Sequence, residues 1–181
     1  PRIISSKNEL KAAGAGVIRD FQLVGWLGEL ETNVLMLMMD RVSLSTVDVE
    51  MDNLILPLHI TRAKTKMKAF EKDGEIVVRL EIKMQADLKR HLFQRFGETD
   101  SNAYYKRLQE EASRMLEHQI ISLYKKIQKE FGADLLQVGE YLRKHEPDLW
   151  EKVKGNWDEV YRTTKVEADV DFKIMRLGIT M

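Results

Sequence analysis

Residues 73–88, DGEIVVRLEIKMQADL, carry the clearest structural signal in this chain of 181 residues. Asp73-Gly74 is a typical turn between two antiparallel strands. The residues after it alternate between apolar and polar, which predicts a strand with one buried and one solvated face. The apolar face consists of Ile76, Val78, Leu80, Ile82, Met84, Ala86 and Leu88. Because only one face is apolar, the pattern favours an antiparallel sheet.

Alternating patterns on both sides of this stretch predict further strands. Residues 60–69 alternate in the same way, and one of their faces is cationic: Arg62, Lys64, Lys66 and Lys68. Upstream, apolar residues at positions 47, 49 and 51 alternate with acidic ones, and the following Pro57 is typical of a sheet edge or a strand start. A last strand is expected over residues 165–174, with its position and direction in the sheet left open.

Helices are expected between these strands. Helical spacing of apolar residues predicts a long helix over residues 102–131, which Gly132 can end in a left-handed turn. Shorter helices are expected over residues 29–41 and 134–144. Proline suits the first turn of a helix, so Pro147 predicts the start of a third short helix. The apolar face of that helix would carry Trp150, Val153, Trp157 and Val160.

Together these elements predict the α+β class. We expect a mostly antiparallel twisted sheet of about four to five strands, with a long helix and shorter helices packed on one face. Residues 1–16 are weakly patterned and are interpreted as a linker or a lead-in helix, and residues 17–26 as a short hairpin. Residues 17–181 would then form a single domain.

Composition excludes several classes of function. Lys and Arg total 29 and Asp and Glu total 29, so the chain has no general attraction to nucleic acid. The absence of cysteine excludes disulfides, thiolate zinc sites and cysteine nucleophiles. No run of residues approaches the roughly 20 apolar positions that span a bilayer.

No motif for catalysis, metal binding or cofactor binding is present. The four histidines, His59, His91, His118 and His145, fall on different expected elements and show no metal-binding spacing. Phosphate-binding loops and the nucleophile elbow are absent, and the paired carboxylates are typical of solvated helix faces. We therefore predict no catalytic residue, no metal and no cofactor, with an enzyme of unrecognised type as the remaining alternative.

Two groups of side chains permit a binding role. The basic face Lys64, Lys66 and Lys68 could contact an anionic headgroup or an acidic partner, or could simply face water beside an acidic strand such as residues 167–171. The methionines Met36, Met38 and Met39 and the tryptophans Trp26, Trp150 and Trp157 could anchor a partner. For both of these apolar groups, packing in the core is the favoured interpretation.

The order of several short segments resembles a known family. Leu23-Val24-Gly25-Trp26-Leu27 is followed by Glu31-Thr32, and Gly132-Ala133-Asp134 is followed by residues 140–150 and by the strand that ends near Gly178. This order is similar to the C-terminal domain of the spore germination receptor C subunits, the GerAC-like or Ger(x)C lipoproteins. Asn33-Val34 and Gln137 depart from the family pattern, at positions where local surface contacts could differ.

The resemblance implies a non-enzymatic interaction or scaffold domain of a nutrient germinant receptor. Its expected partners are the membrane subunits A and B, with other spore inner-membrane proteins as further candidates. The full-length lipoprotein would be held on the outer face of the spore inner membrane by an upstream lipid anchor absent from this soluble piece. The candidate interaction surface is Glu31, Thr32, Gln137 and Glu140. The alternative is a small-molecule, germinant-binding module with a pocket between sheet and helices.

Overall fold

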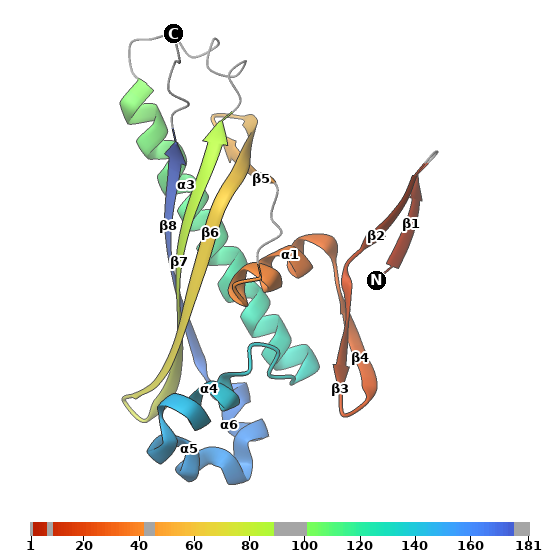
Figure 1. The fold of residues 1–181 in the computed structure, drawn as a ribbon, viewed down its shortest axis with the longest axis vertical. Helices are drawn as coiled ribbons and strands as arrows, with labels where there is room; N and C mark the ends of the chain where they lie inside the picture. Colours follow the sequence, from red (N-terminus) through yellow and green to blue (C-terminus); the bar gives the residue numbers. More distant parts are fainter. Residues whose placement is uncertain (1, 7–8, 42–45, 89–100, 176–181) are drawn as a thin grey trace.

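Four strands form the central sheet, in the order β5-β6-β7-β8 (Figure 1). The computed structural model describes residues 2–6, 9–41, 46–88 and 101–175. The strands are β5 (Thr46–Met51), β6 (Leu54–Lys72), β7 (Glu75–Leu88) and β8 (Lys165–Met175). β5, β6 and β7 pair antiparallel, whereas β8 pairs parallel with β7. The predicted α+β class with a mostly antiparallel sheet is confirmed.

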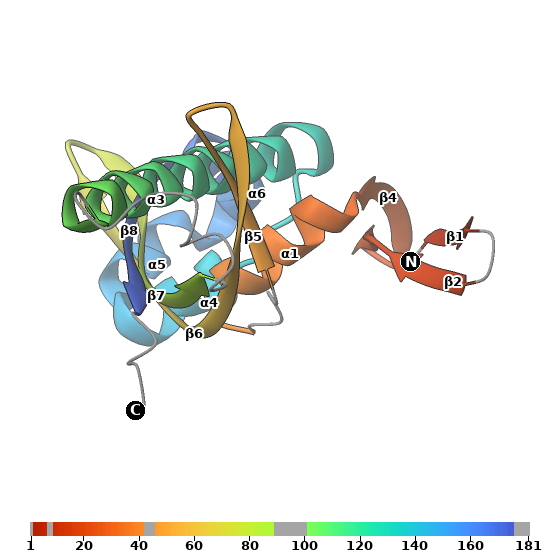
Figure 2. The same cartoon turned by 90° about the horizontal axis from the view of Figure 1, so that it is seen from above.

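β8 reaches its place through the long helix α3 (Ser101–Lys126) and the helices that follow it. A parallel strand needs a crossover connection, and these helices supply it. α3 covers one face of the sheet (Figure 2), and the shorter helices lie at one end of the sheet (Figure 1). α3 also protects the outer edge of β8. The side chains of Glu117 and Gln109 accept hydrogen bonds from the backbone N–H groups of Val170 and Ile174, at 3.0 and 2.8 Å.

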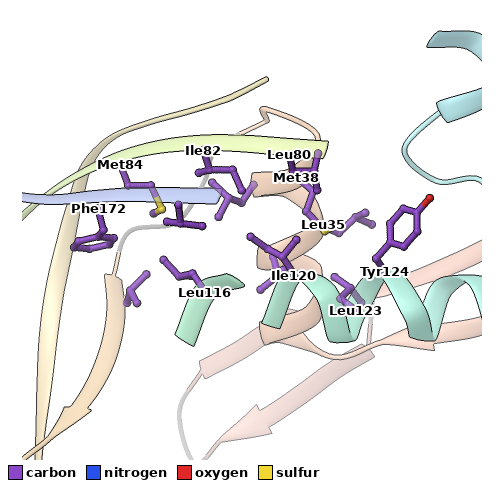
Figure 3. Close-up of a cluster of buried hydrophobic side chains, with 14 of the residues drawn as sticks. Leu35, Met38, Leu80, Ile82, Met84, Leu116, Ile120, Leu123, Tyr124 and Phe172 are labelled. Carbon is purple, nitrogen blue, oxygen red and sulfur yellow. The ribbon is translucent and has the colours of Figure 1, made fainter. Parts of the chain in front are cut away.

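The core lies between α3 and the apolar face of the sheet (Figure 3). Leu80, Ile82 and Met84 of β7 are buried, as the alternating pattern predicts, and they face Leu116 and Ile120 of α3. Tyr124 near the end of α3 and Gln128 just beyond it are buried as well. The helix continues as the π-helix η2 (Ile127–Phe131), and Gly132 ends it with φ of 57°, as predicted.

The predicted third helix is two helices in the structure. α5 (Pro147–Val153) and α6 (Trp157–Thr163) are separated by the 3₁₀ turn η3 (Lys154–Asn156). Gly155 lies in that turn, and glycine and asparagine are poor helix formers, which accounts for the break. The rings of Trp150 and Trp157 still meet, with centroids 5.7 Å apart.

The segment before the central sheet forms two hairpins and a helix. β1 (Arg2–Ser6) pairs with β2 (Glu9–Ala13), so these residues form strands and not a lead-in helix. β3 (Ala15–Arg19) pairs with β4 (Gln22–Leu27), in agreement with the predicted hairpin, and α1 (Glu29–Met38) follows. The domain boundary at residue 16 stays a prediction.

Two expectations about β6 can be compared with the structure. Pro57 lies within β6 opposite Asp48, so the strand start is wrong. The other alternative, a sheet edge, agrees with the structure, because β6 pairs there with β5 alone and its pairing with β7 begins at Leu58. The acidic strand β8 does not lie directly beside the basic face of β6, because β7 separates them. The alternation of charges in the sequence could not reveal this order.

Candidate interaction site

The β3–β4 hairpin exposes an unusual concentration of apolar side chains. Among the described residues, nine large apolar side chains are exposed, and six of them lie on this hairpin or the first turn of α1. We call these six the apolar hairpin patch: Ile18, Phe21, Leu23, Val24, Trp26 and Leu30. The hairpin lies beside α1 and away from the central sheet (Figure 1). Apolar groups gathered in this way mark interaction sites on many proteins.

The strand register places most of the patch on one face of the hairpin. Gly16 pairs with Trp26 and Ile18 pairs with Leu23, so the side chains of these residues share a face. Val24 is the extra residue of a β-bulge, and the shift in register that it causes brings Leu23 to the same side as Trp26. The side chains of Leu23 and Trp26 lie over Gly16, where a Cβ atom would come within 3.0 and 3.5 Å of them.

The opposite face of the hairpin is fixed to the rest of the protein. Val17 and Leu27 are buried in the core. The ring of Phe131 lies so close to Gly25 that a Cβ atom there would be 2.3 Å from the ring. Arg19 adds an ion pair to Asp158 of α6, at 2.5 Å. The hairpin is therefore held in position while its outer face stays exposed.

The tip of the hairpin is a two-residue turn of unfavourable composition. Asp20 and Phe21 have φ of 50° and 62°, the positive values that a type I′ turn requires at both positions. Glycine usually occupies the second position, because a bulky side chain in this region is strained. Phe21 occupies it here and its side chain is fully exposed. Strain of this kind often coincides with functional sites.

Two residues of the predicted interaction surface, Glu31 and Thr32, lie next to this patch at the start of α1. The carboxylate of Glu31 accepts hydrogen bonds from the backbone N–H of Gly28 at 2.8 Å and from Lys126 of α3 at 2.6 Å. Burial alone would raise the pKa of Glu31, but the bonds from Lys126 and Gly28 outweigh it and hold the pKa below its usual value. The Thr32 hydroxyl donates to the Gly28 carbonyl at 2.8 Å. These polar groups cap α1 and tie it to α3.

The other two predicted residues, Gln137 and Glu140, lie on α4 (Val138–His145) or next to it. Gln137 is exposed with φ of 58°, and Glu140 bonds to Arg143 at 2.7 Å and to Lys144 at 3.0 Å. Hydrogen bonds from Arg143 and then Lys144 lower the pKa of Glu140 to about 2. Within the described residues, no hydrogen bond or ion pair joins this pair to Glu31 and Thr32, so the four residues form two separate groups.

Asp134 organises the turn before α4, a role that no sequence pattern predicted. Its carboxylate accepts hydrogen bonds from the N–H groups of Val138 and Gly139, both at 2.8 Å, and from the indole of Trp157 at 3.3 Å. α4 therefore begins at Val138 and not at Asp134 as predicted. Burial raises the pKa of Asp134, despite these bonds, which lower it. The residue joins α4 to α6.

The described residues offer little else that resembles a reactive site. Among them, no three side chains of His, Asp or Glu are arranged to hold a metal ion, and His91 lies outside the described residues. A hollow of about 600 Å³ lies between α3 and β8, where the small-molecule alternative would place its pocket. A pocket for a small molecule is expected to have a mostly apolar lining, and this hollow does not. Most of the lining side chains are charged or polar: Lys106, Gln109, Glu110, Ser113, Arg114, Glu117 and Asp171.

Comparison with known proteins assigns the chain to a family. The family described as spore germination B3/GerAC like, C-terminal, matches residues 13–178. The chain belongs to this family. The resemblance inferred from the order of short segments is thereby confirmed.

Two spore germination proteins of Bacillus subtilis (strain 168) are similar over nearly the whole chain. Spore germination protein B3 is 29% identical over 96% of this chain and 47% of its own length. Spore germination protein YndF is 23% identical over 97% of this chain and 44% of its own length. The chain thus spans about half the length of these relatives.

A solved structure, described as the crystal structure of the GerBC protein, has the same fold. It superposes with a TM-score of 0.83 at 28% identity, over 96% of this chain and 55% of that one. In the part of the chain that the structure describes, no helix is both long and apolar enough to cross a bilayer.

Two of the segments that carry the GerAC-like resemblance meet in space. Gly25 and Trp26 belong to β4, and the ring of Phe131, just before Gly132-Ala133-Asp134, packs on Gly25. The prediction that Trp26 packs in the core is wrong, because its side chain is 42% exposed, whereas Trp150 and Trp157 pack against the core. One signal in the sequence could have revealed this patch, because both faces of the hairpin carry apolar residues. A hairpin with one face in water would carry them on its buried face only.

Proposed function

We propose that this chain is a non-enzymatic interaction domain of a germinant receptor C subunit, acting in spore germination together with the membrane subunits A and B. Its GerAC-like family and the names of its relatives support the setting. The observation that carries the interaction role is the apolar hairpin patch on an anchored hairpin. In the full-length protein, an upstream lipid anchor would hold the domain at the outer face of the spore inner membrane.

The partner surface that fits this hairpin is an apolar groove on a membrane subunit. A projecting two-stranded hairpin with an aromatic residue at its tip can insert into a concave surface, and aromatic side chains are the usual anchors of such contacts. Anchoring through Val17, Gly25 and Leu27 lowers the entropy lost on binding, because the hairpin is already ordered. Gln137 and Glu140 remain candidates for a second, polar contact.

The proposal is tested by substitution of an exposed isoleucine in the patch and of a matched one outside it. Ile18 is 66% exposed in β3, and Ile55 is 69% exposed in β6. Ile18→Ser, introduced into the full-length C subunit together with Phe21→Ser, should lower the amount of A and B subunits recovered with it from spore membranes by about tenfold or more. Ile55→Ser should leave recovery unchanged. Equal recovery with all variants would contradict the proposal.

A second measurement tests whether another part of the C subunit covers the patch. If another part of the same polypeptide covered the hairpin, Ile18→Ser with Phe21→Ser would lower the melting temperature of the isolated full-length C subunit. We expect the melting temperature to stay within about 2 °C of the wild type, because exposed apolar side chains contribute little to stability. A clear drop would assign the patch to an intramolecular contact and overturn the role in subunit assembly.

A further inference from the structure

The solvated face of the sheet is organised in rows of charged side chains that run across β6, β7 and β8. The strand register aligns the residues of each row side by side. Two of these rows balance when taken together, since they hold three basic and three acidic side chains. They consist of Lys66, Glu81 and Asp169 in one row and Lys68, Arg79 and Glu167 in the next. Ion pairs join Lys68 to Glu81 and Arg79 to Glu167, both at 2.7 Å.

The two neighbouring rows toward the other end of the sheet are not balanced. One row is Arg62, Gln85 and Lys173, and the other is Lys64, Lys83 and Asp171. Lys64 and Lys83 lie directly opposite each other, and like charges in such a pair destabilise a sheet. Lys68 and Arg79 are also opposite each other, but each of them has an acidic partner at 2.7 Å.

These unbalanced rows line a hollow of about 320 Å³ on the sheet surface. Asp40 at the end of α1 bonds to Lys64, and Asp171 lies 3.3 Å from Lys173. Arg62 and Lys83 have no ion-pair partner among the described residues. The hollow therefore has four cationic side chains and two carboxylates around it, with two of the cations uncompensated.

We propose that this hollow binds a small phosphate-bearing anion. A guanidinium can donate two parallel hydrogen bonds to phosphate oxygens, and a lysine ammonium supplies a point charge beside it. Arg62 and Lys83 are the primary ligands in this assignment, and Lys64 and Lys173 contribute charge. A bound anion would remove the repulsion between Lys64 and Lys83.

The shape and the charge of the surroundings favour a small anion over a membrane or a nucleic acid. The excess of positive charge lies around the hollow, while the two rows that begin with Lys66 and Lys68 sum to zero charge and the whole chain has no net charge. A flat anionic membrane or a nucleic acid needs a wider basic surface. The residues that line the hollow include no aromatic ring on which a base could stack.

This assignment narrows the basic face predicted from the sequence. Lys64 belongs to the hollow, whereas Lys66 and Lys68 lie in the balanced rows beside Glu81. Arg62, Lys83 and Lys173 become part of the site because the sheet brings three strands together.

The test compares Lys83→Gln with Lys66→Gln, which removes the same charge from the same face one row outside the hollow. Thermal unfolding of the 181-residue chain is followed in increasing pyrophosphate, with sodium chloride at matched ionic strength as the reference. Pyrophosphate should raise the melting temperature of the wild type and of Lys66→Gln. Lys83→Gln should weaken the apparent affinity by up to about fivefold, and Arg62→Gln with Lys83→Gln should abolish the shift.

Lys83→Gln should also raise the melting temperature slightly at low salt without pyrophosphate, because it removes the repulsion with Lys64. Equal responses of Lys83→Gln and Lys66→Gln, or equal effects of pyrophosphate and chloride, would overturn the site as general ionic screening. Flotation with phosphatidylglycerol and phosphatidylcholine vesicles separates the source of the phosphate. Lys83-dependent binding to phosphatidylglycerol without a pyrophosphate shift would assign the hollow to a lipid headgroup and overturn the free-anion proposal. The site is independent of the hairpin, so Lys83→Gln should leave subunit recovery unchanged.

Discussion

The central sheet with α3 and the β3–β4 hairpin use apolar residues in opposite ways. Leu80 of the sheet and Ile120 of α3 are fully buried, because the sheet and the helix cover each other. In the hairpin, only Val17 and Leu27 find such a layer, and the outer face remains exposed. The comparison shows that alternation of apolar and polar residues predicts a strand in both places. Its apolar face is buried only where a second layer of structure packs on it.

The largest expected effect tests the buried side of this comparison. Ile120→Ala should lower the free energy of unfolding by about 2 to 5 kcal/mol, because it removes buried methylene groups and leaves a cavity between α3 and β7. Ile18→Ala, the matched change on the exposed face, should alter the free energy by less than about 0.5 kcal/mol. Urea unfolding of both variants measures the difference. Similar losses would show that the hairpin is part of the core.

The second effect concerns the short helices, where the half-buried carboxylate of Asp134 bonds to the start of α4. Asp134→Ala should lower the free energy of unfolding by about 2 kcal/mol, because the N–H groups of Val138 and Gly139 lose their acceptor. Asp48→Ala, at an exposed position of β5, serves as the control and should have little effect. Circular dichroism during urea unfolding gives both values, and equal values would show that Asp134 is not needed for the start of α4.

The third effect has the opposite sign and separates stability from assembly. Phe21→Gly should raise the free energy of unfolding by about 1 kcal/mol, because it relieves a positive φ and completes an Asp-Gly type I′ turn. The same change should reduce recovery of the A and B subunits with the full-length protein. A variant that is more stable and still assembles normally would exclude Phe21 as an anchor.

The smallest effect is a pH dependence at the point where the hairpin leads into α1. Folding lowers the pKa of Glu31 below its ordinary value of 4.5. Its contribution to stability is therefore present above about pH 4.5 and is lost as the pH falls through the lower folded-state pKa. Glu31→Gln should melt below the wild type at pH 7, and the gap should close in acid.

Glu50→Gln, on the exposed face of β5, is the control for this pH dependence and should show no such closing gap. If the gap between Glu31→Gln and the wild type stayed constant from pH 7 to pH 3, the bond between Glu31 and Lys126 would not be an ionic contribution.

Local patterns were sufficient for the elements with strong periodicity. The alternation in β7, the Asp73-Gly74 turn and the glycine stop after Phe131 were all correctly predicted, because each depends on residues close together in the chain. The break between α5 and α6 was missed, since the apolar spacing of Trp150 and Trp157 suits one helix as well as two. The exposure of Trp26 was missed as well, because it depends on what covers the hairpin.

The sequence by itself determined the strands of the central sheet, the long helix, the family and the absence of cysteine chemistry, because these follow from residue identity and short-range spacing. Only the tertiary structure decided that β8 lies parallel to β7, that the hairpin keeps one apolar face exposed, and that Lys64 faces Lys83. Strand order, the packing of one layer on another and cross-strand pairing all depend on residues far apart in the chain. Local periodicity does not indicate which distant segment will pack beside a given strand.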